Sequence, residues 1–395
     1  LGAWPREARA WADRGVEVIG ERELAFRESL CLHLAIAGAG GKSTTAGMIA
    51  HVLRAAGRRV EVACGVGSPA CLHVEGSRDL DFLVHGIEPG ELEHLEYFRP
   101  VVAVLLNAPL DFPGLGSGAG EAERALGRLF ARQQAFDWAI LEKEAWSRLR
   151  AAGVGVPAKR LTFSTTDTEA DLGVDRGLLL SRLPDWAGAL WDTARAGLRG
   201  PHLAEDALAT LAVGHVLRIP LEEMTLALEG FRAGPGCFEH LGAADGVSYI
   251  HDGRCRNVDS LRKSLLGVAP TPPERPFVQL IAGGDVAGRG IYELGPVMAA
   301  RVKEAVLFGE AAPALHAAWG LFTPCTPMTS LVDAAHRAIN QAQPGETVLF
   351  SPGCPSSPDP GGDVFRSAVG GRLEAAPAVD PALSPPSTPG GKTRA

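Results

Sequence analysis

The sequence predicts an α/β protein with two units, each built on a mainly parallel sheet covered by helices. Three observations predict this class. Short apolar stretches alternate with helical segments along most of the 395 residues, and this alternation is typical of βαβ units. A glycine-rich stretch, AIAGAGGKSTTAG at residues 35–47, lies between an apolar run and a helical segment. A Gly-Pro break at 233–236 separates two such series, and a chain of this length usually contains more than one core.

The first half of the chain begins with a lead-in, residues 1–30, in which we expect a helix and then a short strand at Val16–Ile19. Residues 171–200 are rich in glycine and lack helical periodicity, so a small antiparallel excursion is expected there. Between them the alternation predicts strands at 32–37, 59–64, 80–85, 101–106, 137–141 and 160–163. Helices are predicted at 42–56, 90–97, 119–134, 203–217 and 221–231.

The second half continues the pattern, with strands predicted at 247–251, 277–282, 304–308 and 347–351, and helices near 258–267, 293–302, 311–319 and 329–342. The final residues, APAVDPALSPPSTPGGKTRA, are too polar and proline-rich to bury a core, so a disordered tail is expected. The predicted organisation is a lead-in at 1–30, a central domain at 31–233, a C-terminal domain at 234–378 and a tail at 379–395.

Composition excludes several classes of protein. The net charge of −8 and the lack of a basic block argue against a nucleic-acid binder. No apolar run approaches the roughly 18 residues of a membrane span, so no membrane insertion is expected. The seven cysteines include no C-x-x-C pair, which indicates reduced thiols in a cytoplasmic protein. The oligomeric state is left open.

The stretch Gly38–Thr44 has the chemistry of a phosphate-binding loop. Small residues let backbone N–H groups approach phosphate oxygens, and the helix that follows adds a favourable dipole. Lys42 is placed to reach the β- and γ-phosphates of ATP, and Ser43 or Thr44 to ligate Mg²⁺. The predicted phosphate-binding residues are Gly38, Gly40, Gly41, Lys42, Ser43 and Thr44. The loop is two residues shorter than the usual G-x-x-x-x-G-K-[ST] pattern, which would need glycine at Ile36.

This shorter loop resembles the ATP loop of the Mur ligases, T-G-T-N-G-K-[ST]-T, and further motifs extend the resemblance. GVEVIGERELAF (15–26) is similar to V-I-G-E-x-E-L, and CGVGSPA (64–70) to G-N-I-G-x-P. FEHLGAADGVSYIHDGRCRNVDS (238–260) resembles a segment ending N-D-S-K-A-T-N-x-x-S. LIAGGD (280–285), VLFGE (306–310) and VLFSPGCPSS (348–357) are similar to L-L-G-G-x-D, the F-G strand and L-S-P-A-C-A-S. Within the family the match is nearest to the ligases that add D-glutamate.

The resemblance implies a central P-loop ATPase domain and a C-terminal Rossmann-like domain. The family's N-terminal UDP-binding domain would precede residue 1, so the lead-in would be its last part. The resemblance also implies ATP and Mg²⁺ as cofactors, and UDP-N-acetylmuramoyl-L-alanine and D-glutamate as substrates. In that reaction ATP phosphorylates the precursor carboxylate, and the amine attacks the resulting acyl phosphate.

The residues that serve the metal and phosphate in the family are altered here. The glutamate position falls on Gly86, and Glu88 is the candidate substitute. A later motif, NAPLDFPG, keeps Asn107 and Asp111 but has Phe112 at the histidine position. The candidate catalytic residues are therefore Lys42, Glu88 and Asp111, and the candidate metal ligands are Ser43 and Glu88.

The family's carbamylated lysine has no counterpart either. The stretch between Lys42 and Lys143 holds no lysine, and no histidine follows His94 within it. By register the lysine position falls near Leu129, where the neighbouring Arg128 supplies charge but cannot be carbamylated. The metal centre of the family is therefore incomplete in this sequence.

Accessory positions are kept only in part. His202, Asp252 and Arg254 match nucleotide-binding positions, and Ser356 matches the serine that holds the carboxylate of the incoming amino acid. Cys237 stands where the family has a nucleotide-binding arginine. Arginine in place of lysine at Arg254 keeps the charge but presents it differently.

Three hypotheses follow. The chain is an active D-glutamate-adding ligase with an unusual metal site, or a ligase-derived protein that no longer catalyses and binds ATP, a precursor fragment or another cell-wall protein. The third, an unrelated P-loop NTPase, is disfavoured by the ordered C-terminal matches. Loss of several charged groups at one centre removes both metal organisation and transition-state charge, which favours the second hypothesis.

Overall fold

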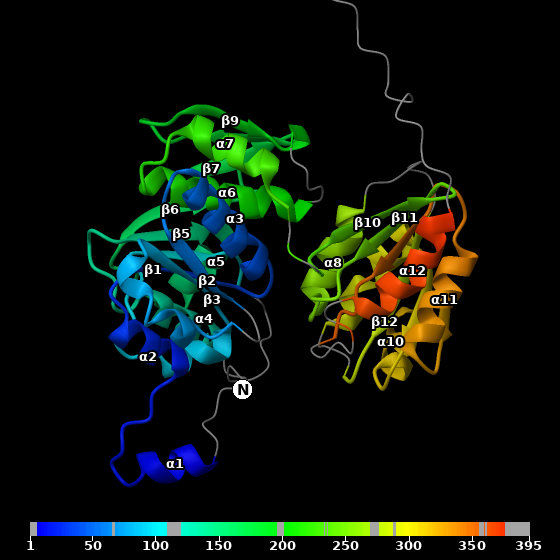
Figure 1. Ribbon diagram of the computed structural model, residues 1–395, viewed down its shortest axis with the longest axis horizontal. Coiled ribbons are helices and arrows are strands. Elements are labelled where there is room, and N and C mark those ends of the chain that lie inside the picture. Colours follow the sequence, from blue (N-terminus) through cyan, green and yellow to red (C-terminus); the bar gives the residue numbers. More distant parts are fainter. Residues whose placement is uncertain are drawn as a thin grey trace, which may run out of the picture.

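The computed structural model describes residues 6–64, 68–108, 120–195, 201–232, 234, 236–268, 276–286, 290–354, 359 and 362–375. These residues form two sheets, of nine and six strands, each with helices on both faces (Figure 1). The predicted α/β class with two mainly parallel sheets is confirmed.

The first sheet has the strand order β2-β3-β1-β4-β5-β6-β7-β8-β9. Its pairs are parallel from β2 to β7, and β8 and β9 complete an antiparallel meander where the sequence predicted one. The strands are β1 (Leu32–Ala37), β2 (Val60–Cys64), β3 (Phe82–Ile87), β4 (Val102–Leu105), β5 (Trp138–Glu142), β6 (Lys159–Phe163), β7 (Leu172–Asp175), β8 (Leu178–Ser181) and β9 (Gly188–Asp192).

Helices cover this sheet because successive strand residues are apolar on both faces. Leu34 and Ile36 of β1 belong to the core beneath α3 (Lys42–Ala55), α6 (Pro201–Val216) and α7 (Leu221–Gly230). Ala35 and Ala37 face the opposite core, which is covered by α4 (Glu121–Gly127), α5 (Lys143–Ala151) and the 3₁₀ turns η3 (Pro89–His94) and η4 (Arg128–Phe130). The segment predicted as a helix at 90–97 forms the 3₁₀ turn η3 instead. The longer helix predicted at 119–134 is divided into α4 and η4. Further 3₁₀ turns are η1 (Ala70–His73), η2 (Ser77–Asp79) and η5 (Thr193–Arg195).

The lead-in contains two helices, α1 (Arg6–Ala12) and α2 (Glu21–Glu28). The strand predicted at Val16–Ile19 is wrong, because these residues pair with no strand among those described. In contrast, α2 is anchored on the segment between η3 and β4. The buried Glu23 carboxylate accepts hydrogen bonds from the backbone N–H groups of residues 96, 97 and 98, at 3.0, 2.9 and 3.1 Å.

The second sheet has the order β10-β11-β15-β12-β13-β14 and is parallel except for the β10–β11 hairpin. Its strands are β10 (Glu239–Ala244), β11 (Val247–His251), β12 (Val278–Gly283), β13 (Val302–Phe308), β14 (Cys325–Pro327) and β15 (Thr347–Phe350). One face is covered by α8 (Val258–Gly267), η6 (Ile291–Leu294), α9 (Gly295–Arg301) and α10 (Ala312–Trp319), and the other by α11 (Leu331–Gln341) and α12 (Asp363–Ala375).

Each sheet has a point at which the strand order reverses, and such points bind ligands at the carboxyl ends of the strands. In the first sheet β1 lies between β3 and β4, and in the second β15 lies between β11 and β12. The predicted boundary at 233–236 lies between α7 and β10, and its described neighbours Arg232 and Gly234 are exposed. No described helix has the length and apolar character needed to span a membrane.

Candidate nucleotide-binding site

The glycine-rich loop joins β1 to α3 at the reversal point of the first sheet. Gly41 precedes α3 with φ of 87°, a left-handed conformation that favours glycine. The side chain of Asn107, just after β4, holds the loop from beneath. Its Oδ1 accepts from the backbone N–H groups of Ala39 at 2.6 Å and Gly40 at 3.3 Å, and its Nδ2 donates to the Gly40 carbonyl at 3.2 Å.

Lys42 lies inside this loop and is only 8% exposed. Its Nζ donates to the Gly38 carbonyl at 2.9 Å and lies 3.2 Å from Glu88 Oε2. Glu88 follows β3 directly and its side chain is 54% exposed. The structure therefore brings together two predicted site residues that are far apart in sequence, an ammonium group at the start of α3 and a carboxylate facing it.

Ser43 and Cys64 meet next to this pair. The Ser43 Oγ lies 3.3 Å from the Cys64 Sγ at the end of β2. Cys64 also pairs with Gly86 across β2 and β3, and a Cβ added at Gly86 would lie 2.0 Å from the Cys64 sulfur. The Cys64 thiol fills the space that a side chain at Gly86 would need. The motif matches made from the sequence would place glycine at Cys64 and glutamate at Gly86 in the family, which would be an exchange of the position that carries a side chain.

Beneath the loop, Thr45 of α3 donates its hydroxyl to Asp206 Oδ1 of α6 at 2.7 Å. Asp206 is 3% exposed, and burial raises the pKa of its carboxyl from 3.8 to about 7. The hydrogen bond from Thr45 opposes this shift without cancelling it. The buried contact between α3 and α6 therefore contains a carboxyl group, that of Asp206, which can hold a proton near neutral pH.

We expect Asp206→Asn to flatten the pH dependence of stability. The pKa of Asp206 is higher in the folded than in the unfolded protein. Its contribution to the free energy of unfolding is therefore present at low pH and is lost as pH rises toward about 7. Relative to the variant, the unchanged chain should lose roughly 2–3 kcal/mol of unfolding free energy between about pH 5 and pH 8. Denaturant unfolding of both proteins at the two pH values measures this difference, and parallel pH profiles would contradict the assignment.

The second unit contacts the loop through the N-terminal end of α8. Asn257, which caps α8, donates Nδ2 to the Ala39 carbonyl at 3.1 Å, and a Cβ added at Gly40 would lie 2.8 Å from Ser260 Oγ. Lys263 on the same helix pairs with Glu205 of α6 at 2.9 Å. The phosphate loop is therefore contacted by residues of both units of the chain.

Two predicted nucleotide contacts lie on the segment before α8. Asp252 is buried, and its carboxylate accepts from Ser264 Oγ at 2.5 Å, Ser351 Oγ at 3.0 Å and the Phe238 N–H at 3.1 Å. Burial raises the pKa of Asp252 to about 6. Arg254 is exposed on the same segment. The structure thus engages Asp252 within its own unit, through α8 and the loops beside the sheet, and leaves Arg254 at the surface.

Other predicted positions are less defined. Asp111, Phe112 and Ser356 lie outside the described residues. His202 lies in the first turn of α6, but its side chain is outside the described part. Leu129 is fully buried in the core beneath α4 and α5, so the position assigned by register to the carbamylated lysine faces the core.

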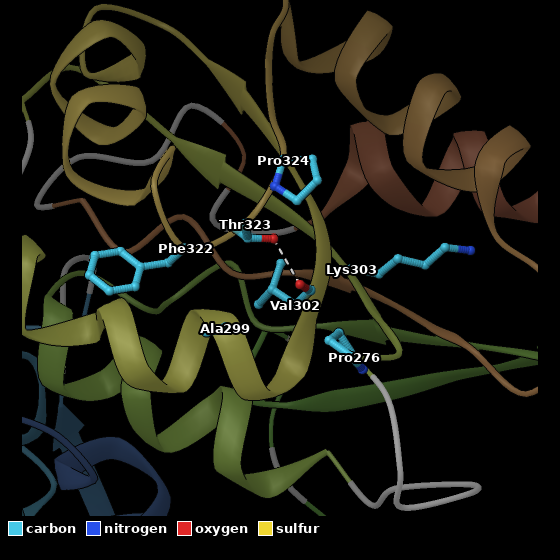
Figure 2. Close-up of a pocket in the computed structure, with 7 residues that line it drawn as sticks. All are labelled: Pro276, Ala299, Val302, Lys303, Phe322, Thr323 and Pro324. Atoms are coloured by element: carbon cyan, nitrogen blue, oxygen red, sulfur yellow. Dashed lines mark hydrogen bonds between the residues drawn. The ribbon is translucent and has the colours of Figure 1, made fainter.

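Arg128 does not reach the loop. It donates to the Glu93 carbonyl at 2.9 Å and, with Arg132, lines a hollow of about 460 Å³ beside residues 18–19 of the lead-in. Another cavity, of about 300 Å³, lies where β12, β13 and β14 begin, which is the end of the second sheet opposite its reversal-point loops (Figure 2). Its Thr323 donates to the Val302 carbonyl at 2.8 Å and its Lys303 pairs with Glu346. Neither hollow belongs to the phosphate loop.

Ser43 and Glu88 fit Mg²⁺ in part. Mg²⁺ is usually held by one or two protein oxygen ligands together with phosphate oxygens and water. The Ser43 hydroxyl and the Glu88 carboxylate are such ligands, and both lie next to Lys42. The described residues contain no group of three or more His, Cys, Asp or Glu side chains that could hold a metal. A cation here would therefore depend on the phosphates of a bound nucleotide.

Sequence analysis missed three features of this site: the Cys64 contact with Ser43, the Asn257 contact with the loop, and the buried groups behind Glu88 described below. The exchange between Cys64 and Gly86 was visible in the two motifs, but only the strand register shows that the positions are adjacent.

Comparison with known proteins gives strong matches along most of the chain. A UDP-N-acetylmuramoylalanine–D-glutamate ligase from Nitratidesulfovibrio vulgaris is 32% identical over 364 residues, covering 91% of this chain and 77% of the relative. The ligase of the same name from Geobacter metallireducens is 32% identical over 353 residues, covering 89% and 75%. No family model matches the chain.

Solved structures share the fold. MurF from Acinetobacter baumannii superposes with a TM-score of 0.65 at 16% identity, covering 89% of this chain and 78% of that one. MurF ligase from Thermotoga maritima, solved in complex with ADP, gives a TM-score of 0.64 at 14% identity, with 94% and 85% coverage. Folylpolyglutamate synthase from Mycobacterium tuberculosis gives 0.66 at 14% identity, with 88% and 93% coverage.

Proposed function

The chain belongs to the Mur ligase family, and we propose that it binds Mg·ATP at Gly38–Thr44 as a relative of the ligases that add D-glutamate to UDP-N-acetylmuramoyl-L-alanine. One observation carries the nucleotide proposal. Lys42 lies inside a glycine loop at the reversal point of a parallel sheet, with Glu88 opposite its ammonium group. This is the arrangement in which a lysine can exchange a carboxylate for a phosphate.

The proposed reaction has two steps. A carboxylate oxygen of the precursor attacks the γ-phosphorus of ATP and ADP leaves, and the amine of D-glutamate then attacks the acyl carbon and phosphate leaves. Lys42 would hold the β- and γ-phosphates, and Ser43 and Glu88 would hold Mg²⁺, which would neutralise charge on the transferred group. The side chain of Asn107 would fix the loop in this shape.

We further propose that the chemical step is slow in this chain. The glutamate position is Gly86, its space is filled by Cys64, and the register position of the carbamylated lysine is the buried Leu129. Removal of one well-placed electrostatic group typically costs about 10²–10³ in rate. A chain with several such replacements would bind nucleotide better than it transfers phosphate.

We also propose that the protein acts in the cytoplasm. All seven cysteines of the chain are free thiols, which is usual in that reducing compartment.

The alternative is an active ligase with a rebuilt metal site. The position of Glu88 favours it, because a carboxylate 3.2 Å from Lys42 could replace the missing glutamate. The two proposals share the nucleotide site and differ in turnover.

Calorimetric titration with ATP, with and without Mg²⁺, tests the shared part. We expect micromolar affinity, since the phosphate loop is intact although Cys237 replaces a nucleotide-binding arginine. Absence of binding at millimolar ATP would contradict the proposed function.

A further inference from the structure

Behind Glu88, a chain of polar groups crosses the first unit from the lead-in helix α2 to the phosphate loop. Arg22 of α2 is 6% exposed and lies at its centre. Its Nε donates to Glu91 Oε2 at 3.0 Å, and its Nη1 donates to the Ala63 carbonyl at 3.2 Å. The same Glu91 oxygen accepts the backbone N–H of Glu88 at 2.8 Å. Arg22 thus joins the end of β2 to the turn that presents Glu88.

On its other side Arg22 meets two buried histidines. Its Nη1 lies 3.5 Å from His85 Nδ1, His85 Nε2 lies 2.7 Å from His33 Nδ1, and His33 Nε2 lies 2.5 Å from Ser29 Oγ. A guanidinium can only donate, so His85 accepts at Nδ1 and donates from Nε2, and His33 donates to Ser29. Each imidazole thus accepts one hydrogen bond and donates another, so both imidazoles must be neutral.

Burial supports the neutral state of both rings. Burial lowers the pKa of His33 to about 4 and that of His85 well below its ordinary value. The two rings stack with centroids 4.9 Å apart, and Phe98 packs edge-on against both. Arg22 is therefore fixed by a packed, directional chain of donors and acceptors rather than by one flexible ion pair.

We propose that Arg22 is a positioning residue of the Mg·ATP site, which holds the Glu88 carboxylate opposite Lys42 through Glu91. The inference rests on the proposed function, because it gives Glu88 the task of holding Mg²⁺ on the nucleotide. Glu88 is half-exposed and caps the short 3₁₀ turn η3 in a reciprocal capping box with Glu91, in which each side chain accepts from the backbone N–H of the other. The Arg22–Glu91 pair fixes this box from behind, since one carboxylate oxygen binds both the guanidinium and the Glu88 backbone.

The test measures how much Mg²⁺ strengthens ATP binding in Arg22→Leu and Glu91→Leu, because leucine at either position removes one partner of the Arg22–Glu91 hydrogen bond. Metal-free ATP should bind both variants within about twofold of the unchanged chain, because Lys42 and the glycine loop are intact. The Mg²⁺-dependent gain should fall about 10- to 100-fold, as is typical when a group that orients a metal ligand is removed. The double variant should lose little more than either single one, because both changes break the same link.

Arg27→Leu is the matched control. Arg27 lies on the same helix, but its guanidinium binds Glu23 and Glu17 and not the turn at Glu88. It should leave the Mg²⁺ gain unchanged. If Arg22→Leu does not fold, as judged by thermal unfolding, Glu91→Leu carries the test, because the Glu91 side chain is 41% exposed.

The outcomes separate the two proposals. An unchanged Mg²⁺ gain in folded Arg22→Leu or Glu91→Leu would overturn the role of Arg22 alone. No Mg²⁺ gain in the unchanged chain while ATP binds would overturn both the Mg²⁺ part of the proposed function and the role of Arg22. Failure of the unchanged chain to bind ATP at all would overturn the proposed function and this inference with it.

Discussion

Lys42→Ala is expected to weaken ATP binding by about 100-fold. The ammonium of Lys42 is the only described cation in the loop, and it makes two contacts, with the Gly38 carbonyl and with Glu88. A hydrogen bond to a charged group contributes about 1.5–3 kcal/mol, which is a factor of about 10 to 100 in affinity. Removing Lys42 also leaves the Glu88 carboxylate unpaired next to the phosphates, so the effect should lie at the upper end.

Calorimetric titration of the variant and of Lys143→Ala measures this effect. Lys143 begins α5, and its Nζ donates to the Glu169 carbonyl at 3.2 Å, away from the loop. Its replacement should leave the affinity within about twofold. If Lys42→Ala binds ATP as tightly as the unchanged chain, the assignment of Gly38–Thr44 to phosphate is wrong.

The second large effect is expected at the exchanged pair, Cys64 and Gly86. Gly86→Glu alone should destabilise the protein by about 3 kcal/mol or more, because its Cβ would lie 2.0 Å from the Cys64 sulfur inside the sheet. Cys64→Gly removes the obstructing atoms at a cost of about 1–2 kcal/mol. In the double variant the two changes should offset each other by about 2 kcal/mol or more, which is a large coupling for adjacent residues.

Denaturant unfolding of the two single variants and the double variant gives this coupling energy. Cys71→Gly combined with Gly86→Glu is the control, because Cys71 lies in η1 and is not among the atoms that a Cβ at Gly86 would meet. The changes in free energy of unfolding of this control pair should be additive. If those of Cys64→Gly and Gly86→Glu are additive as well, Cys64 does not occupy the space of a side chain at Gly86. If the double variant also gains Mg²⁺-dependent phosphate transfer, loss of the glutamate limits the present chain.

Much of the fold could be predicted because the apolar strands carry the signal directly. The run Leu32–Ala37 is apolar at nearly every position and forms the central strand β1. Val16–Ile19 has a similar local composition but pairs with no strand in the described part of the chain, so it forms no strand. The opposite error occurred at Glu239–Ala244, where a polar, glycine-containing segment pairs with β11 at the edge of the second sheet.

The site was predictable only where function is local in sequence. Gly38–Thr44 carries its chemistry in consecutive residues, so a phosphate-binding role could be proposed from the sequence alone. The contacts around it depend on strand register and helix docking. Arg22, His33 and His85 come from α2, β1 and β3, and no periodicity in the sequence indicates that they touch. The same holds for Leu129, whose burial shows that a match by register does not place a residue at the site.

Turnover of the unchanged chain tests the central claim most directly, that this is a Mur-family nucleotide site with a weakened chemical step. Phosphate release is measured with ATP, Mg²⁺, UDP-N-acetylmuramoyl-L-alanine and D-glutamate, with Lys42→Ala as the blank. We predict ATP binding in the same protein sample but release far below the about 1 s⁻¹ of an ordinary enzyme. Release near about 1 s⁻¹ that depends on D-glutamate and is absent in Lys42→Ala would contradict the account and identify an active ligase with a rebuilt site at Glu88.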